Sequence, residues 1–275
     1  MRLGYGLGGV LSASLLLLFV LPIAALFWTA GSAGIFAALA NQGFVVSIEF
    51  TLLASAIAVA IGLLLGVPLG YFLARFEFRG RSLIESIVLL PVMIPHLVVG
   101  LGLLLVFLPG TPLGEAASAV GLPVFDHPAG VVLVMLYVGT SYVVLASQNA
   151  FRSLDRGAVE AARSLGATPA EAFWSVSLPH AASGVLTGGL LMWARGVSEV
   201  GGFLILAAAV YPGPGWGGPV TSPASVYIYN LYGTGGLAGA TAASALLVLV
   251  ALAIFLAVRA LAGAAPRFGP LGGGG

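Results

Sequence analysis

Long apolar stretches recur along the chain and are separated by shorter polar segments. A helix needs about 20 apolar residues to cross the roughly 30 Å hydrocarbon core of a bilayer. The stretches that reach this length are Val10–Ala30, Phe44–Ala74, Leu83–Leu108, Ala129–Phe151, Ser183–Ala209 and Leu237–Ala262. This pattern predicts an all-α polytopic membrane protein with six transmembrane helices. The Gly/Pro-rich end, Pro266–Gly275, predicts a disordered tail.

The arginines predict how these spans are oriented. If the N-terminus is cytoplasmic, nine of the ten arginines fall on the inner side, either outside the spans or at the inner end of the sixth, and the tenth, Arg195, lies within the fifth span. The inner arginines are Arg2, Arg75, Arg79, Arg81, Arg152, Arg156, Arg163, Arg259 and Arg267. Inner loops are enriched in Lys and Arg, so both termini are expected in the cytoplasm. A cleaved signal peptide is the alternative for the first span, but its apolar stretch exceeds the usual ~7–15 residues.

Composition excludes several classes of protein. Only 7% of the residues are charged and 60% are hydrophobic, whereas soluble domains carry about 25% charged residues. The chain has no cysteine, which excludes disulfides and thiolate metal sites. All ten basic residues are arginines, so the lysine of a phosphate-binding P-loop is missing. We therefore expect this chain not to hydrolyse ATP itself.

One polar segment, between the fourth and fifth spans, predicts a pair of short helices. The first helix is expected from Asp155 to Leu165, with Gly166 as a left-handed C-terminal residue. Thr168, with Pro169 and Glu171 after it, forms a capping box that begins a second helix, which is expected to end before Pro179. The local signals leave two interpretations open, a rigid cytoplasmic protrusion and an ordinary surface loop.

The same segment resembles the EAA loop of permease subunits in binding-protein-dependent ABC importers. The positions that match the motif E-A-A-x3-G-x9-[IV]-x-L-P are Glu160, Ala161, Ala162, Gly166, Val176, Leu178 and Pro179. The resemblance implies the type I ABC importer fold and a coupling helix that docks on a separate ATP-hydrolysing subunit. Glu160 would contact that subunit, Gly166 would set the turn, and Leu178 and Pro179 would fix where the loop rejoins the membrane.

The resemblance also implies an organisation and a set of partners. Residues 1–43 would hold the first span and an outer loop, residues 44–262 the permease core with the coupling loop at about 152–180, and residues 263–275 the tail. The expected partners are two copies of the ATP-binding subunit, an extracytoplasmic solute-binding protein and a second copy of this chain. The chain itself would carry no cofactor, because ATP and magnesium would bind to the ATPase subunit, and no nucleic acid is expected.

Charged residues inside a span mark a candidate substrate pathway, because their insertion into lipid is costly. Arg195 and Glu199 lie four residues apart and share one helical face of the fifth span. They could line a pathway for an anion or form a structural ion pair, and Ser198 lies between them. Glu49, near the outer end of the second span, could pair with Arg195 or reach the headgroup region.

The stretch from Trp193 to Gly202 resembles a segment of the molybdate, tungstate and sulfate permease branch, and its Ser-Glu-Val-Gly form is closest to tungstate and molybdate members. The resemblance implies an oxyanion substrate.

Two prolines of the third span, Pro91 and Pro95, remove backbone donors, kink the helix and could line a gate. His96 is expected to be a satisfied core or interface histidine. No second ligand follows it at metal spacing, so no metal site is expected.

Small residues recur at every fourth position of the second span and predict close helix packing. These residues are Ala54, Ala58, Gly62, Gly66 and Gly70.

Two other functions are alternatives to that of an ABC importer permease. An ion-coupled secondary transporter would require inverted repeats, which are not evident, and would leave the charged hairpin unexplained. A membrane protease lacks a recognisable catalytic constellation in this sequence.

Overall fold

The computed structural model describes residues 2–213 and 215–264, which are almost entirely helical. The helices are α1 (Arg2–Ala40), α2 (Gln42–Arg75), α3 (Arg81–Met93), α4 (His96–Phe107), α5 (Pro112–Ala119), α6 (Pro128–Arg152), α7 (Arg156–Ser164), α8 (Pro169–Ala172), the π-helical turn η1 (Phe173–Ser177), α9 (Leu178–Val197), α10 (Gly201–Leu206) and α11 (Ala224–Ala264). The predicted tail lies outside the described residues, apart from its first two positions.

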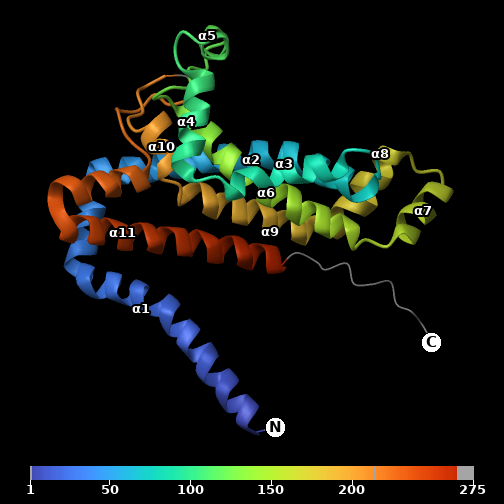
Figure 1. Ribbon diagram of the computed structural model, residues 1–275, viewed down its shortest axis with the longest axis horizontal. Coiled ribbons are helices and arrows are strands. Elements are labelled where there is room, and N and C mark those ends of the chain that lie inside the picture. Colours follow the sequence, from blue (N-terminus) through green and yellow to red (C-terminus); the bar gives the residue numbers. More distant parts are fainter. Residues whose placement is uncertain (1, 214, 265–275) are drawn as a thin grey trace.

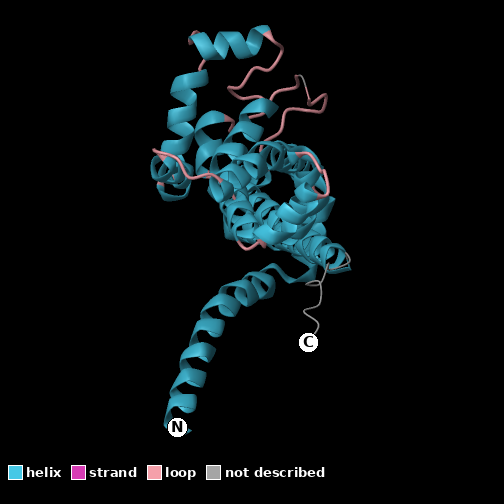
Figure 2. Cartoon of the chain, turned by 90° about the vertical axis from the view of Figure 1, so that its right-hand side faces the viewer, coloured by secondary structure: helices cyan, strands magenta, loops and turns pink. Residues whose placement is uncertain are grey.

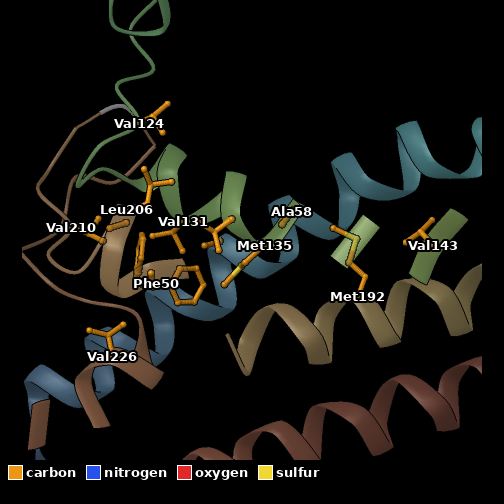
Figure 3. Close-up of a cluster of buried hydrophobic side chains, with 14 of the residues drawn as sticks. Phe50, Ala58, Val124, Val131, Met135, Val143, Met192, Leu206, Val210 and Val226 are labelled. Atoms are coloured by element: carbon orange, nitrogen blue, oxygen red, sulfur yellow. The ribbon is translucent and has the colours of Figure 1, made fainter. Parts of the chain in front are cut away.

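The centre of the fold is a bundle in which α2, α6 and α9 lie against one another (Figure 1). Their contact is a buried apolar cluster that includes Phe50 and Ala58 of α2, Val131 and Met135 of α6, and Met192 of α9 (Figure 3). The loops after α2 and α6 and the α7–α8 hairpin lie at one end of the bundle, and α10 with the loop that follows it lies at the other (Figure 1). Most of the arginines that are predicted to lie on the inner side are therefore at the end of the bundle that carries the hairpin.

The stripe of small residues on α2 packs against α6 and α9, as the sequence predicts. All of its members are buried. A side chain placed on Gly66 would meet Val143 at 2.9 Å, and one placed on Gly62 would clash with Met192. The absence of side chains along this face allows the helix backbones to approach closely.

Gly70→Ala tests this close approach. A Cβ at Gly70 would lie 2.8 Å from both Ser147 Cβ and the backbone oxygen of Val144, where little can move. Overpacking of this kind costs about 1–3 kcal/mol, so we expect a lower thermal unfolding midpoint in detergent. Gly102→Ala is the matched control, because nothing lies within 4 Å of that position in α4. An unchanged midpoint for Gly70→Ala would contradict the packing argument.

Two of the predicted spans are not single helices. The third breaks between α3 and α4, whose axes differ in direction by 111°, so α4 stands away from the bundle with α5 beyond it (Figure 1). Pro91 remains inside α3, whereas Pro95 forms the N-cap of α4. The fifth breaks after Val197, and a separate short helix, α10, follows. The predicted kink of the third span is present at Pro95 as a break between two helices, and the prediction of one continuous fifth span was wrong.

The first and last helices are each interrupted at a glycine. Gly31 in α1 has φ 59° and Gly236 in α11 has φ 76°, backbone conformations that side chains disfavour. The predicted first span ends just before Gly31, and the predicted sixth span begins just after Gly236. The part of α1 after its break packs on α11, whereas the N-terminal part projects away from the body with its apolar side chains exposed (Figure 2).

The described residues contain four helices that are long and apolar enough to cross a membrane, or five if the bent α3–α4 pair counts as one span. These helices are α1, α2, α6 and α11. The second and fourth predicted spans are thereby confirmed to within a few residues. The count of six spans and the cytoplasmic location of both termini stay predictions.

Candidate functional site

The hairpin between α6 and α9 is built by local capping interactions. Asp155 precedes α7 and accepts a hydrogen bond from the Gly157 amide at 2.9 Å. After α7, Gly166 adopts φ 97° and reverses the chain, which confirms its predicted left-handed conformation. Glu160 and Ala161 are exposed on α7, and Ala162 is partly covered. The side chains of Glu160 and Ala161 are therefore presented at the surface rather than buried in the core.

The predicted capping box is present at the start of α8. The Thr168 hydroxyl accepts from the Glu171 amide at 3.2 Å, while the Thr168 amide donates to Glu171 Oε2 at 2.7 Å. The Thr168 amide and then the Thr168 hydroxyl, which donates to the same oxygen at 2.8 Å, lower the pKa of the Glu171 carboxyl. Glu171 is therefore ionised at neutral pH, which suits a position in the first turn of a helix.

The predicted end of the second hairpin helix was wrong. The chain does not leave the helix before Pro179, because α8 continues through the π-helical turn η1 directly into α9. Pro179 follows the π-helical turn at the beginning of α9, so the helix continues past a residue that donates no backbone hydrogen bond. Leu178 and Pro179 therefore lie where the hairpin continues into α9 as an unbroken helix, which can pass a displacement along its axis.

Two apolar side chains of the hairpin are exposed, and sequence reasoning did not single them out. Leu165, at the end of α7, is 89% exposed, and Trp174, in η1, is 67% exposed. Phe173, beside Trp174, instead packs its ring against Tyr71 of α2 at a centroid distance of 4.9 Å. The hairpin is thus anchored on one side and offers two large apolar side chains on the other.

The second candidate site is a polar cluster at the breaks of the third and fifth spans. Arg195 Nη2 donates to Glu199 Oε2 at 2.6 Å and to His96 Nε2 at 2.6 Å. His96 Nδ1 lies 3.3 Å from the same carboxylate oxygen. This arrangement fits the histidine tautomer that carries its proton on Nδ1, because Nε2 can then accept from Arg195.

Glu199 is fully buried, and both oxygens of its carboxylate accept hydrogen bonds within the protein. Its Oε1 accepts from the Gly202 amide at 2.7 Å, at the beginning of α10. Its backbone oxygen accepts from the Ser225 hydroxyl at 2.5 Å, which ties the break to α11. Arg195 retains 16% side-chain exposure, and the His96 side chain is 49% exposed. Of these groups, the arginine and the histidine are the ones that a solute can reach.

The other predicted pathway residues lie in different positions. Ser198 is exposed and donates to the Arg195 backbone oxygen at 3.1 Å, as the C-terminal cap of α9. Pro95 is next to His96 at the break, and Pro91 lies one turn earlier. Glu49 is exposed on α2 and forms no ion pair within the described residues, so of its two predicted alternatives the pair with Arg195 is not formed.

A further carboxylate, Glu85 of α3, was overlooked although it lies inside the predicted third span. Its Oε1 accepts hydrogen bonds from Gln148 and Arg152 of α6 and from Arg81. An acidic residue within an apolar stretch, with an arginine four positions earlier, was the available signal. His96 had a weaker signal, its position directly after Pro95.

A cavity of about 620 Å³ lies elsewhere, between the start of α2, the start of α11 and the loop that joins α10 to α11. Its polar lining consists of hydroxyl and amide side chains: Gln42, Thr221, Ser222, Tyr227, Asn230 and Thr234. Arg195 and His96 do not line it. In the described part of the chain, no three potential metal ligands come together.

Comparison with known proteins places these features in a family. Residues 66–266 match the family described as binding-protein-dependent transport system inner membrane component. A molybdate/tungstate transport system permease protein of Pyrococcus furiosus is 32% identical over 80% of this chain and 78% of its own. A probable molybdenum ABC transporter permease protein of Haloferax volcanii is 34% identical over 93% and 90%. A probable sulfate transport system permease protein of Zygnema circumcarinatum is 29% identical over 82% and 76%.

Solved structures of similar fold are also ABC importers. A chain of a bacterial alginate ABC transporter in complex with a periplasmic protein aligns with TM-score 0.68 at 19% identity, covering 92% of each chain. A chain of the MetNI methionine ABC transporter aligns with TM-score 0.60 at 19% identity, covering 82% of this chain and 97% of that one. The fold is therefore that of type I ABC importer permeases, and the secondary-transporter and protease alternatives are set aside. The chain belongs to the inner-membrane permease family of binding-protein-dependent ABC importers.

Proposed function

We propose that this chain is the membrane subunit of an ATP-driven importer for an oxyanion, with molybdate or tungstate as the first candidates. An extracytoplasmic binding protein would deliver the anion, and the importer would reside in the cytoplasmic membrane. The observation that carries the proposal is the partly exposed Arg195 at the break of α9. The names of the similar proteins from Pyrococcus furiosus and Haloferax volcanii support the choice of anion.

Arg195 is suited to meet an anion although it is already paired. Within the described residues, its hydrogen bonds all leave from Nη2. The Nε and Nη1 groups therefore stay available, and a guanidinium can present two parallel N–H groups to the oxygens of a tetrahedral anion. Glu199 holds the guanidinium in place from the protein side. Because Glu199 neutralises the arginine, the remaining N–H groups can hydrogen-bond an anion while the pair itself places no net charge in the membrane.

The hairpin is the proposed contact with the ATPase subunit. Its exposed Leu165 and Trp174 offer apolar surface, and the exposed Glu160 of α7 offers a charge. The interaction would bury these side chains in a groove of the partner, which would carry ATP and magnesium. Two copies of this chain and two ATPase subunits would form the complete transporter, since one such bundle encloses little space for a pathway.

The outer loops support delivery by a binding protein. Among the residues between α4 and α6, Glu115 and Asp126 are the charges, and burial raises the pKa of the Asp126 carboxyl. No cationic surface therefore concentrates anions at this entrance.

Sulfate or another small solute is the alternative cargo, which the similarity to the Zygnema circumcarinatum protein favours.

The test is ATP hydrolysis in proteoliposomes that contain this chain with its ATPase subunit. The binding protein is added empty, or loaded with tungstate, molybdate or sulfate. We expect the tungstate- or molybdate-loaded form to stimulate hydrolysis above the empty form. Stimulation by sulfate alone would establish the alternative cargo, and a complex that none of these anions stimulates would refute the oxyanion proposal.

A further inference from the structure

The carboxylate of Glu85 joins α3 to the cytoplasmic end of α6. Its Oε1 accepts from Gln148 Nε2 at 2.6 Å, from Arg152 Nη2 at 2.9 Å and from Arg81 Nε at 3.2 Å. Gln148 is only 3% exposed, so its amide depends on this acceptor. Hydrogen bonds to an ionised group are the stronger ones, and this single oxygen therefore fastens two helices together.

The position of this contact matters because Arg152 is the last residue of α6. The hairpin begins a few residues later with α7, so Glu85 contacts the root of the hairpin's first arm. The second arm runs through η1 into α9 without interruption. A displacement of the hairpin can thus reach α9 along a continuous helix and can reach α3 through Glu85.

Both routes end at the same polar cluster. His96 follows the C-terminal end of α3, directly after the break at Pro95, and Arg195 lies near the C-terminal end of α9. His96 accepts a hydrogen bond from Arg195, so the two helix ends meet there. Helix α3 itself has no buried residue, and its other side-chain tie to α6 is the hydrogen bond from Ser141 to the Val88 backbone oxygen at 2.6 Å. A helix held so lightly by apolar packing can shift as a rigid body when one end is pulled.

We propose that Glu85 is a positioning residue for transport, which transmits movement of the hairpin to α3 and so moves His96 in step with Arg195. The proposal rests on the proposed function, because it requires an ATPase subunit that displaces the hairpin. Without Glu85 the hairpin drives α9 alone. Arg195 then shifts while His96 stays behind, and ATP hydrolysis is no longer matched by passage of the anion.

The measurement is the amount of anion taken up per ATP hydrolysed, in proteoliposomes with the complete transporter. We expect Glu85→Ala to lower this ratio about tenfold, within the usual range for coupling between distant sites. Copurification of the ATPase subunit should be unchanged. Glu77→Ala is the matched control, because Glu77 is an exposed carboxylate in the loop before α3 with no ion pair in the described part of the chain. Glu85→Gln keeps an acceptor oxygen without the charge, and we expect a smaller loss.

A covalent link between α3 and α6 tests whether the loss in Glu85→Ala comes from lost transmission of movement or from lost stability of the protein. The chain has no cysteine, so Glu85→Cys with Arg152→Cys gives one defined pair of thiols. Linking them with a short thiol cross-linker should restore uptake per ATP, whereas the unlinked pair should stay uncoupled. A Glu85→Ala protein with reduced yield but a normal ratio, or a linked pair that stays uncoupled, would overturn the proposal. If the unaltered chain fails to bind any ATPase subunit, the proposed function fails instead.

Discussion

Replacing Arg195 by methionine will destabilise the protein by about 3–5 kcal/mol, because the substitution leaves the Glu199 carboxylate buried without its countercharge. Glu199 is fully buried, and His96 and the Gly202 amide are its remaining partners within the described residues. Neither supplies the full positive charge that the arginine does. The expected signs are a large drop in thermal midpoint in detergent and a low yield of folded protein.

The double variant Arg195→Met with Glu199→Gln should regain most of that stability. It removes both charges, and the glutamine still offers an amide oxygen to the Gly202 amide. Replacing both members of a buried ion pair is often close to neutral for stability. Arg79→Met is the control for the loss of an exposed arginine, since Arg79 lies in the loop between α2 and α3.

Uptake by the double variant decides between the two roles of the pair. If Arg195 meets the anion, the folded double variant will transport at least about tenfold more slowly, which is the loss expected for one hydrogen bond to a charged group. We expect this result. Uptake at the level of the unaltered chain would show that the pair is structural and that the anion passes elsewhere.

Gly166→Leu should lower ATP hydrolysis stimulated by the loaded binding protein by about 5- to 30-fold while the chain still inserts in the membrane. The glycine has φ 97°, and a left-handed backbone costs a side-chain-bearing residue roughly 1–2 kcal/mol. Nothing lies within 4 Å of the Cβ position, so the effect is conformational rather than a clash. The strained turn would reorient α7 relative to α8 and misplace Leu165.

Gly166→Asn and Gly121→Leu are the matched controls for this prediction. Asparagine tolerates the left-handed conformation, so Gly166→Asn should keep most of the stimulated activity. Gly121 has φ 78° with equally open surroundings, but it lies in the loop between α5 and α6, far along the chain from the hairpin. If Gly166→Leu retains full stimulation, the turn does not set the docking geometry.

The parts of the structure that depend on local signals could be predicted from the sequence. The second and fourth spans follow from long apolar runs, and the hairpin follows from Asp155, Gly166 and the Thr168 capping box. These signals act within a few residues, so the chain carries them wherever the segment lies. The same holds for the ion pair of Arg195 and Glu199, which are one helical turn apart.

The breaks and the assembled cluster depend on tertiary contacts and could not be predicted. Hydropathy is as high after Val197 as before it, and the break is stabilised by the Gly202 amide on the Glu199 carboxylate. Of the two prolines in the third span, Pro91 is accommodated within α3 and Pro95 is not, although both remove a donor. His96 joins Arg195 across 99 positions of the chain, a distance that no sequence period reveals.

The broken third span has a consequence for the electrical insulation of the membrane. Helix α4 has 12 residues, so at about 1.5 Å per residue it is too short to cross the roughly 30 Å hydrocarbon layer. Backbone groups at its break with α3 are tolerated at that depth only against protein or water, and the half-exposed His96 lies beside them. Protein or water must therefore replace lipid around the break at this point. The barrier to ion leakage is there set by short helices and their side chains rather than by the full thickness of lipid.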